Sequence, residues 1–213
     1  MNNSKSAIKV PALSTAYGGR IFGSRYKARW ALFMDLIGIE YAYRHDGNYQ
    51  SFGAWEPDFC VDAGATYLHV SPLPIESERL NQAKFFVEKA NAEQGFTQLF
   101  LIHGRIGAPR RADDSPYVMR RLCKHDSRSF PKDPPSFALE DIRYAWGECA
   151  NCFDVSPNFA DGDPSCRFCG EDTTCTSEAL KEAYRAAQSI KLDSWANLRL
   201  TLAVRPTKVE LLT

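Results

Sequence analysis

The sequence has no apolar run long enough to cross a membrane. Its most apolar stretch, Trp30 to Tyr43, is interrupted by Asp35 and Glu40, whereas a membrane-spanning helix needs about 20 predominantly apolar residues. The first twenty residues also lack the apolar segment of a secretory signal. We therefore expect a soluble protein of the cytoplasm that has no membrane partner.

An excess of charge of one sign is also missing. Lys and Arg number 26 and Asp and Glu number 26, which excludes a globally basic nucleic-acid binder. The charges nevertheless occur in blocks: residues 1–30 carry six basic and no acidic residues, and residues 105–132 carry eight basic and three acidic ones. The blocks are either ordinary solvated surface or a local nucleic-acid-binding face. In the second case the candidate residues are Arg20, Arg25, Lys27, Arg29, Arg110, Arg111, Arg120 and Arg121.

The chain contains no internal repeat and no low-complexity tract, and its 213 residues are 44% hydrophobic, which is enough for a folded core. The spacing of apolar residues predicts helices over 24–37, 76–93 and 176–190 and strands over 40–44, 54–61, 66–71, 97–102 and 198–204. Residues 104–137 are rich in Pro, Arg, Asp and Ser, which predicts a long loop. The order of elements indicates a mixed α/β fold.

Four of the seven cysteines are arranged as a metal-binding pattern. Cys149 and Cys152 form one CxxC, and Cys166 and Cys169 form a second after thirteen residues. Two such turns can present four thiolates to one Zn²⁺, which leaves no open position and makes the site structural. The alternatives are two disulfides or four unrelated thiols. Glycines at 147 and 170 flank the pairs, as tight turns often require.

The segment around these cysteines is acidic, with seven acidic residues and one Arg between 148 and 178. Four thiolates on one Zn²⁺ add further negative charge, so we expect this segment to staple the fold or contact a protein and not to bind phosphates. The other cysteines, at 60, 123 and 175, lie outside the pattern.

Several ordered motifs resemble a known family. FGSRYKARWALFMDLI at 22–37, WEPDFCV at 55–61, TYLHVSP at 66–72 and ERLNQAKFFVE at 78–88 precede the paired cysteines, and EALKEAYRAAQSI follows them at 178–190. Over roughly residues 16–190 the chain resembles restriction-endonuclease-like proteins of the PD-(D/E)xK superfamily from phages and mobile elements. The resemblance implies a restriction-endonuclease-like mixed sheet flanked by helices, with an inserted or appended zinc ribbon. It divides the chain into a nuclease-like core at 1–137, a zinc ribbon at 138–175 and a C-terminal helix and strand at 176–213.

The resemblance also implies an active site that has lost its metal ligands. Members of the superfamily hold one or two Mg²⁺ with a helix Glu, the Asp of the PD motif and the Glu of ExK, whose Lys assists the attacking water. Here Asp58 matches the PD motif, but Lys27 stands at the helix Glu, and His69 and Ser71 stand at ExK. Lys27 and His69 suit a pocket that touches a phosphate without cutting it.

Two functional alternatives follow from the same residues. If the chemistry has migrated, the nearby Glu40, Glu56, Asp62, Glu76 or Lys84 would complete a divergent Mg²⁺- or Mn²⁺-dependent DNA nuclease, or Asp58 and His69 would bind a softer ion such as Mn²⁺ or Zn²⁺. If it has not, the resemblance implies an inactive nuclease-like zinc protein of phage or mobile-element origin. Such a protein would bind DNA or a protein of a replication or defence complex in the host-cell cytoplasm, in the last case as an inhibitor or decoy.

Overall fold

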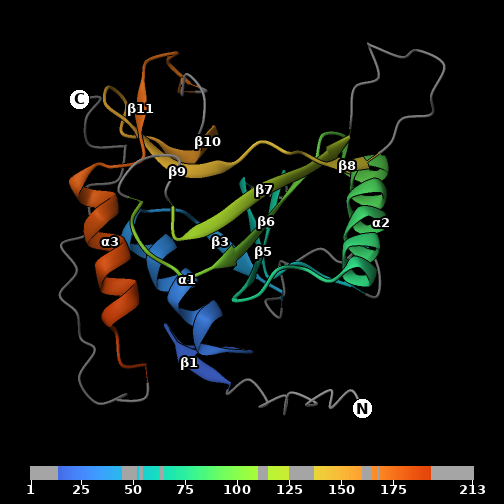
Figure 1. Cartoon of the computed structure of the whole chain (residues 1–213), viewed down its shortest axis with the longest axis horizontal. Helices are drawn as coiled ribbons and strands as arrows, with labels where there is room; N and C mark the ends of the chain where they lie inside the picture. The colour runs from blue at the N-terminus through green and yellow to red at the C-terminus, as the bar shows by residue number, and fades with distance from the viewer. Residues whose placement is uncertain are drawn as a thin grey trace, which may run out of the picture.

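The computed structural model describes residues 14–44, 52, 55–62, 65–109, 115–124, 137–159, 165–166 and 168–192. This part of the chain forms a mixed α/β structure in which a nine-stranded sheet is flanked by three helices, with a separate two-stranded hairpin (Figure 1). No helix within these residues is long and apolar enough to span a membrane. The elements are β1 Thr15–Tyr17, β2 Arg20–Phe22, α1 Arg25–Leu36, β3 Tyr41–Tyr43, β4 Phe59–Val61, β5 Thr66–Ser71, α2 Ser77–Gln94, β6 Gln98–Gly104, β7 Tyr117–Lys124, β8 Phe137–Leu139, β9 Tyr144–Cys149, β10 Val155–Phe159, β11 Thr173–Thr174 and α3 Glu178–Ser189.

The large sheet follows the order β10-β9-β7-β6-β5-β4-β3, with β8 paired to β7 and β11 paired to β9. Only β5 and β6 are parallel among these pairs, and α2 connects them. A parallel pair needs such a crossover connection, whereas antiparallel neighbours do not. The predicted strand–helix–strand unit is therefore confirmed.

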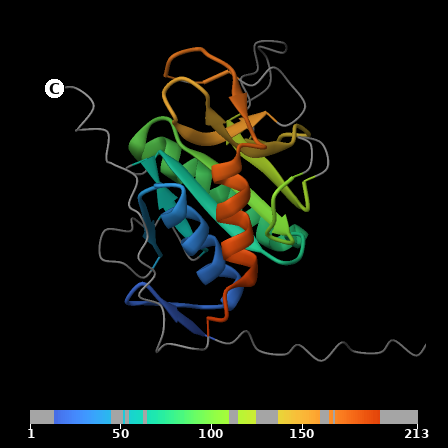
Figure 2. The same cartoon turned by 90° about the vertical axis from the view of Figure 1, so that its left-hand side faces the viewer.

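Helices cover both faces of the sheet. α1 and α3 lie together on one face and α2 lies on the other, as the two perpendicular views show (Figures 1 and 2). On the first face the rings of Phe33 in α1 and Tyr184 in α3 stack with centroids 4.3 Å apart. On the second face Phe86 and Val87 of α2 pack against Leu99 and Leu101 of β6.

The helix predictions are confirmed to within two residues at each end. The Ser24 side chain accepts a hydrogen bond from the Lys27 backbone N–H, which caps α1. Gly38 follows the helix with φ +72°, a conformation that glycine adopts without strain. The predicted strands at 40–44, 66–71 and 97–102 are present as β3, β5 and β6, while only 59–61 of the predicted 54–61 forms a strand, β4.

The predicted loop over 104–137 is wrong, because eight of its residues form β7. Tyr117 and Met119 alternate into the core on one face, and Leu122 enters the core on the other. Arg120 and Arg121 mask this alternation in the sequence, since the acidic Glu140 and Asp141 that pair with them come from a distant segment. The predicted strand over 198–204 lies outside the described residues.

Candidate functional site

Lys27, Asp58 and His69 lie together at one place in the fold. Lys27 comes from the first turn of α1, Asp58 immediately precedes β4, and His69 lies within β5. Lys27 Nζ is 2.5 Å from Asp58 Oδ1, and His69 Nδ1 is 3.0 Å from Asp58 Oδ2. The backbone N–H of Val70 donates a hydrogen bond of 2.9 Å to the same Oδ2. We call these three side chains the Asp58 cluster.

The Asp58 carboxylate is held in its charged form. Its side chain is 0% exposed, while that of Lys27 is 17% exposed. Burial alone would raise the pKa of Asp58, but the contacts with His69 and Lys27 outweigh burial and hold the pKa below its usual value. The Lys27 ammonium therefore neutralises the Asp58 carboxylate, and the His69 imidazole gives it a second side-chain contact.

No further acidic ligand joins Asp58 in the described part of the chain. Among those residues, the four cysteines are the one group of three or more His, Cys, Asp or Glu side chains that could hold a metal ion. Asp62 instead accepts a hydrogen bond from the Thr66 hydroxyl, and Glu40 and Glu76 are exposed. The Asp58 cluster thus offers one carboxylate and one imidazole, with an ammonium group where an ion would have to bind.

Ser71, the fourth position of the family pattern, does not contact Asp58 through any described interaction. It ends β5, and its hydroxyl accepts a hydrogen bond from the backbone N–H of Leu73.

The sequence did not predict two neighbours of the Asp58 cluster. Trp55 packs its ring 5.2 Å from that of His69, and the backbone N–H of Arg44 donates to the Asp58 carbonyl. Only the short spacing in WEPD hinted at Trp55, and nothing in the sequence paired Arg44 with Asp58.

Three described residues of the first basic block, Arg25, Lys27 and Arg29, belong to the N-terminal half of α1. Arg25 is exposed and Arg29 is half-buried on this helix, and the helix has no acidic residue in its first turn. The Nε atoms of Arg29 and Arg44 are buried without a hydrogen-bond partner among the described residues. Arg44 approaches the same end of α1, since its Nη2 lies 3.6 Å from where a Cβ on Gly23 would be.

Three of the remaining predicted basic residues, Arg20, Arg120 and Arg121, have partners within the described part of the chain. Arg20 lies over the ring of Tyr41, 5.2 Å from its centroid. Arg121 makes two hydrogen bonds of 2.9 and 2.8 Å to the carboxylate of Glu140, and Arg120 lies 3.9 Å from Asp141. Adjacent residues of a strand point to opposite faces, so Arg120 and Arg121 cannot act on one surface. Arg110 and Arg111 lie outside the described residues.

The four paired cysteines form a second candidate site. Their sulfurs all lie within 4.8 Å of one another, and neighbouring pairs are separated by 3.4 Å (Cys149–Cys169), 3.5 Å (Cys152–Cys166) and 3.8 Å (Cys152–Cys169). Four sulfurs at about 2.3 Å from a tetrahedral Zn²⁺ would be about 3.8 Å apart. The cluster can therefore hold a metal such as zinc.

Backbone hydrogen bonds favour the thiolate form of two of the four cysteines, Cys149 and Cys166. The N–H groups of Cys152 and Asn151 point at the Cys149 sulfur and lower the pKa of its thiol to about 7. The N–H of Phe168 points in the same way at the Cys166 sulfur. Because a thiolate and not a thiol binds the metal, these bonds favour metal binding at neutral pH.

The two CxxC turns share one backbone design. The N–H of Cys149 donates to the carbonyl of Asp154 and the N–H of Cys166 to that of Glu171, five residues on in each case. The left-handed residues are Phe153 with φ +58° and Gly170 with φ +76°. Gly170 thus has the predicted turn role, but Gly147 does not: it lies within β9, where a Cβ would come 2.7 Å from Asn158 Nδ2.

The cysteine cluster is continuous with the large sheet. β9 ends at Cys149, pairs with β10 and β11 near the cluster, and pairs with β7 through Met119 and Tyr144. No family model, curated protein or solved structure matches this chain. Its function must therefore be inferred from the Asp58 cluster, the basic end of α1 and the four thiols.

Proposed function

We propose that this chain is a non-cleaving, nuclease-like zinc protein that binds nucleic acid. The ion pair between Lys27 and Asp58 carries the proposal. A phosphodiesterase of the PD-(D/E)xK type needs hard cations held by several carboxylates. Here a lysine ammonium neutralises the one carboxylate, so the Asp58 cluster has the charge of a site that tolerates a phosphate and lacks the ligands to activate water. A restriction-endonuclease-like fold and a phage or mobile-element origin are part of the proposal and rest on the resemblance.

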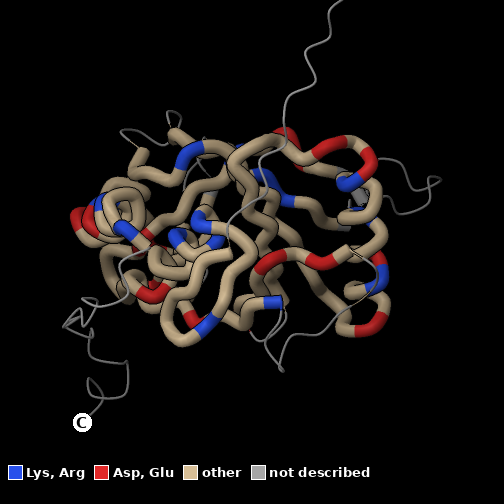
Figure 3. The backbone as a smooth tube through the Cα atoms, turned by 90° about the horizontal axis from the view of Figure 1, so that it is seen from below, with Lys and Arg blue, Asp and Glu red and all other residues tan. Residues whose placement is uncertain are grey.

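The basic end of α1 supports phosphate as the ligand. Arg25 and Lys27 lie in the first turn, where the helix dipole already favours anions and disfavours cations. Buried Nε donors of Arg29 and Arg44 lack partners among the described residues, and a phosphate oxygen would satisfy such a donor. Basic and acidic positions are intermixed over the backbone seen from below (Figure 3). A short footprint of a few phosphates therefore fits better than a long basic stripe.

Zinc is the metal we propose for the four thiols. Thiolate ligands in a closed tetrahedral arrangement select Zn²⁺ and leave no position for a substrate. The ion would join the turn after β9 to the segment before β11, and its role would be structural.

The test measures binding and cleavage separately. Fluorescence anisotropy with a labelled duplex and a labelled single strand at about 50 and 200 mM salt should give an affinity that falls on the order of tenfold or more with salt. Arg25→Glu should abolish most of this binding. Arg185→Glu, which places the same charge change on the exposed face of α3, should leave it intact.

Incubation of plasmid and single strands with Mg²⁺ or Mn²⁺ should give no cleavage. Cleavage that disappears in Asp58→Ala would contradict the inactive-enzyme proposal and favour the divergent nuclease. Binding that is absent or insensitive to salt would remove nucleic acid as the ligand and favour a protein partner, the role of an inhibitor or decoy.

A further inference from the structure

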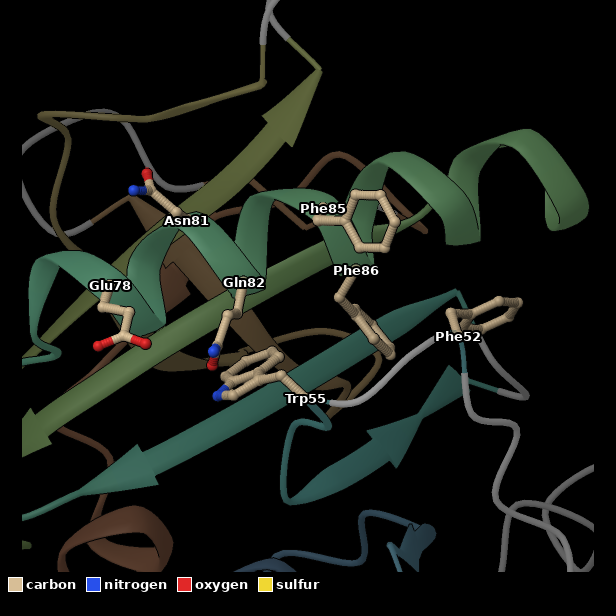
Figure 4. A pocket seen from close by; sticks show the side chains of 7 residues that line it. All are labelled: Phe52, Trp55, Glu78, Asn81, Gln82, Phe85 and Phe86. Atoms are coloured by element: carbon tan, nitrogen blue, oxygen red, sulfur yellow. The ribbon is translucent and has the colours of Figure 1, made fainter.

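A pocket of about 380 Å³ lies between α2 and the segment before β4 (Figure 4). Four aromatic side chains line it: Phe52, Trp55, Phe85 and Phe86. Phe52 and Trp55 both pack edge-on against Phe86, with centroids 5.4 and 5.9 Å away. This arrangement gives the pocket fixed aromatic walls, and its volume is within the range of small-molecule sites.

Three polar side chains complete the lining at the N-terminal part of α2. Glu78, Asn81 and Gln82 belong to the first turns of the helix, and Gln82 points toward Trp55 (Figure 4). None of the three makes a side-chain hydrogen bond or ion pair within the described part of the chain. The pocket therefore combines apolar walls with an unused carboxylate acceptor and two unused amides.

Phe85 does not belong to the hydrophobic core, so core packing does not explain a phenylalanine at this position. The core side of α2 consists of Ala83, Phe86, Val87 and Ala90, whereas Phe85 is 52% exposed. An exposed phenylalanine beside an aromatic cavity is a feature of binding surfaces. Phe96 is exposed to a similar degree, 68%, but does not line the pocket.

The pocket adjoins the Asp58 cluster. Trp55 lines the pocket and also packs against His69, whose imidazole contacts Asp58. A ligand stacked on Trp55 would thus lie one side chain away from the cluster that we propose to touch a phosphate. A ring joined to a phosphate by a short linker fits these two features together.

We infer that this pocket binds a nucleobase. Bases stack on aromatic side chains, and their edges carry the donors and acceptors that a carboxylate and amides recognise. A peptide aromatic ring would fill the walls but leave Glu78 and Gln82 without partners. The inference rests on the proposed function, since it supplies a base-binding subsite next to the Asp58 cluster, whose Lys27 belongs to the proposed phosphate-binding end of α1. The base could come from a strand or from a free nucleotide.

Guanine is the base that the polar lining favours. A carboxylate only accepts hydrogen bonds, and the Watson–Crick edge of guanine offers adjacent N–H donors, whereas adenine offers its amino group beside an acceptor. Glu78→Gln should therefore weaken binding of guanosine monophosphate more than that of adenosine monophosphate. Glu88→Gln, at an exposed position of α2 outside the pocket lining, is the matched control.

The main experiment titrates the full chain with the two monophosphates and follows tryptophan fluorescence, which base stacking on Trp55 would quench. Phe85→Ala should weaken binding about tenfold, since stacking of a base on one aromatic side chain is worth this much. Phe96→Ala should bind as the parent does. Equal affinity of the parent and Phe85→Ala for every probe would overturn the inference.

A single strand and an abasic strand of the same length identify the source of the base. Tighter binding of the strand that has bases, lost in Phe85→Ala, would support the pocket with a strand as the source. Equal binding of both strands, with Phe85-dependent binding of the monophosphate, would support a free nucleotide. If strands bind in a salt-sensitive way but binding of no probe depends on Phe85, the nucleobase pocket is ruled out and the proposed function is supported. If only monophosphates bind, and their binding depends on Phe85, the nucleobase pocket is supported and the proposed binding of nucleic acid is ruled out.

Discussion

At the scale of single residues, Asp58 depends on its two side-chain partners. Burying a carboxylate without a counter-charge lowers the stability of the fold by several kcal/mol, because the charge loses its hydration. Lys27 and His69 offset this cost, and the Val70 N–H adds a directed hydrogen bond. Removing Lys27 or His69 should therefore cost more than that residue's own contacts, because it leaves the buried Asp58 carboxylate with one partner fewer.

Removing the lysine charge tests this dependence. We expect Lys27→Met to lower the free energy of unfolding at pH 7 by about 3 kcal/mol, because Asp58 would stay buried next to an apolar chain. Urea denaturation measures this change. The double variant Lys27→Met/Asp58→Asn should recover a large part of the loss, since it removes the buried charge as well. A double variant no more stable than Lys27→Met would show that the lysine acts only through packing.

The lowered pKa of Asp58 predicts a dependence on acid pH. Burial opposes ionisation, but contacts with His69 and Lys27 bring the folded pKa of Asp58 below its usual value, while the same carboxyl in the unfolded chain has a pKa of about 3.9. The charged form therefore stabilises the fold in full above the unfolded pKa, and this stability is lost as the pH falls through the folded pKa.

Urea denaturation of the parent and of Asp58→Asn between about pH 5 and 2 shows whether the folded pKa of Asp58 is lowered or raised. The stability advantage of the parent should be constant near pH 5 and shrink below about pH 4. An advantage that grows on acidification would mean that the folded pKa of Asp58 is raised instead.

At the scale of elements, the turn from β6 into the following segment requires a glycine. Gly104 has φ +110°, and a Cβ there would come 2.8 Å from the Pro116 carbonyl oxygen and 3.0 Å from the Tyr117 Cα, both backbone atoms. Backbone cannot rotate away as a side chain does. The same residue fixes α1, because its carbonyl accepts a hydrogen bond from the Tyr26 hydroxyl.

Gly104→Ala should therefore lower the free energy of unfolding by about 2 kcal/mol or more, through both backbone strain and overpacking. Gly38→Ala is the matched control: Gly38 also has positive φ, +72°, but no atom lies within 4 Å of its Cβ position. It should cost only the strain of the left-handed conformation, about 1 kcal/mol. Equal losses for the two variants in denaturant titrations would remove the clash at Gly104 from the explanation.

Elements with strong local signals could be predicted from the sequence, and those that depend on distant partners could not. The spacing of apolar residues predicted α1 over 24–37 and β5 over 66–71. β7 was missed because its arginines are neutralised by residues some twenty positions later. The CxxC spacing gave the four-thiol cluster from local pattern alone.

The sites divide in the same way. The family motifs predicted that Lys27, Asp58 and His69 belong to one site. In the structure, both Lys27 and His69 contact Asp58. The pocket could not be predicted from the sequence, because it combines Trp55 with one face of α2. Trp55 precedes β4 and α2 follows β5, and no local sequence pattern relates two such segments. Contacts between elements of this kind need the three-dimensional arrangement.

At the scale of the whole molecule, the four-thiol cluster lies at the end of the large sheet. Cys149 is the last residue of β9, which pairs with β7 of the main body and carries Trp146 into the core beside Phe33 of α1. Loss of the metal would therefore release strands on which the core also depends. A separate ribbon at 138–175 would instead unfold by itself and leave the body intact.

Cys149→Ser should bind less than about one metal ion per chain and lower the apparent Tm by more than about 5 °C, because a loss of about 2 kcal/mol shifts the Tm of a chain of this size by that much. Cys175→Ser, which lies outside the cluster, should keep the metal and the parent Tm. The parent should unfold in one transition whether followed by far-UV circular dichroism or tryptophan fluorescence, because β9 couples the cluster to the core. Two separate transitions, with the first alone moved by Cys149→Ser, would mean that residues 138–175 form a module whose folding is independent of the sheet.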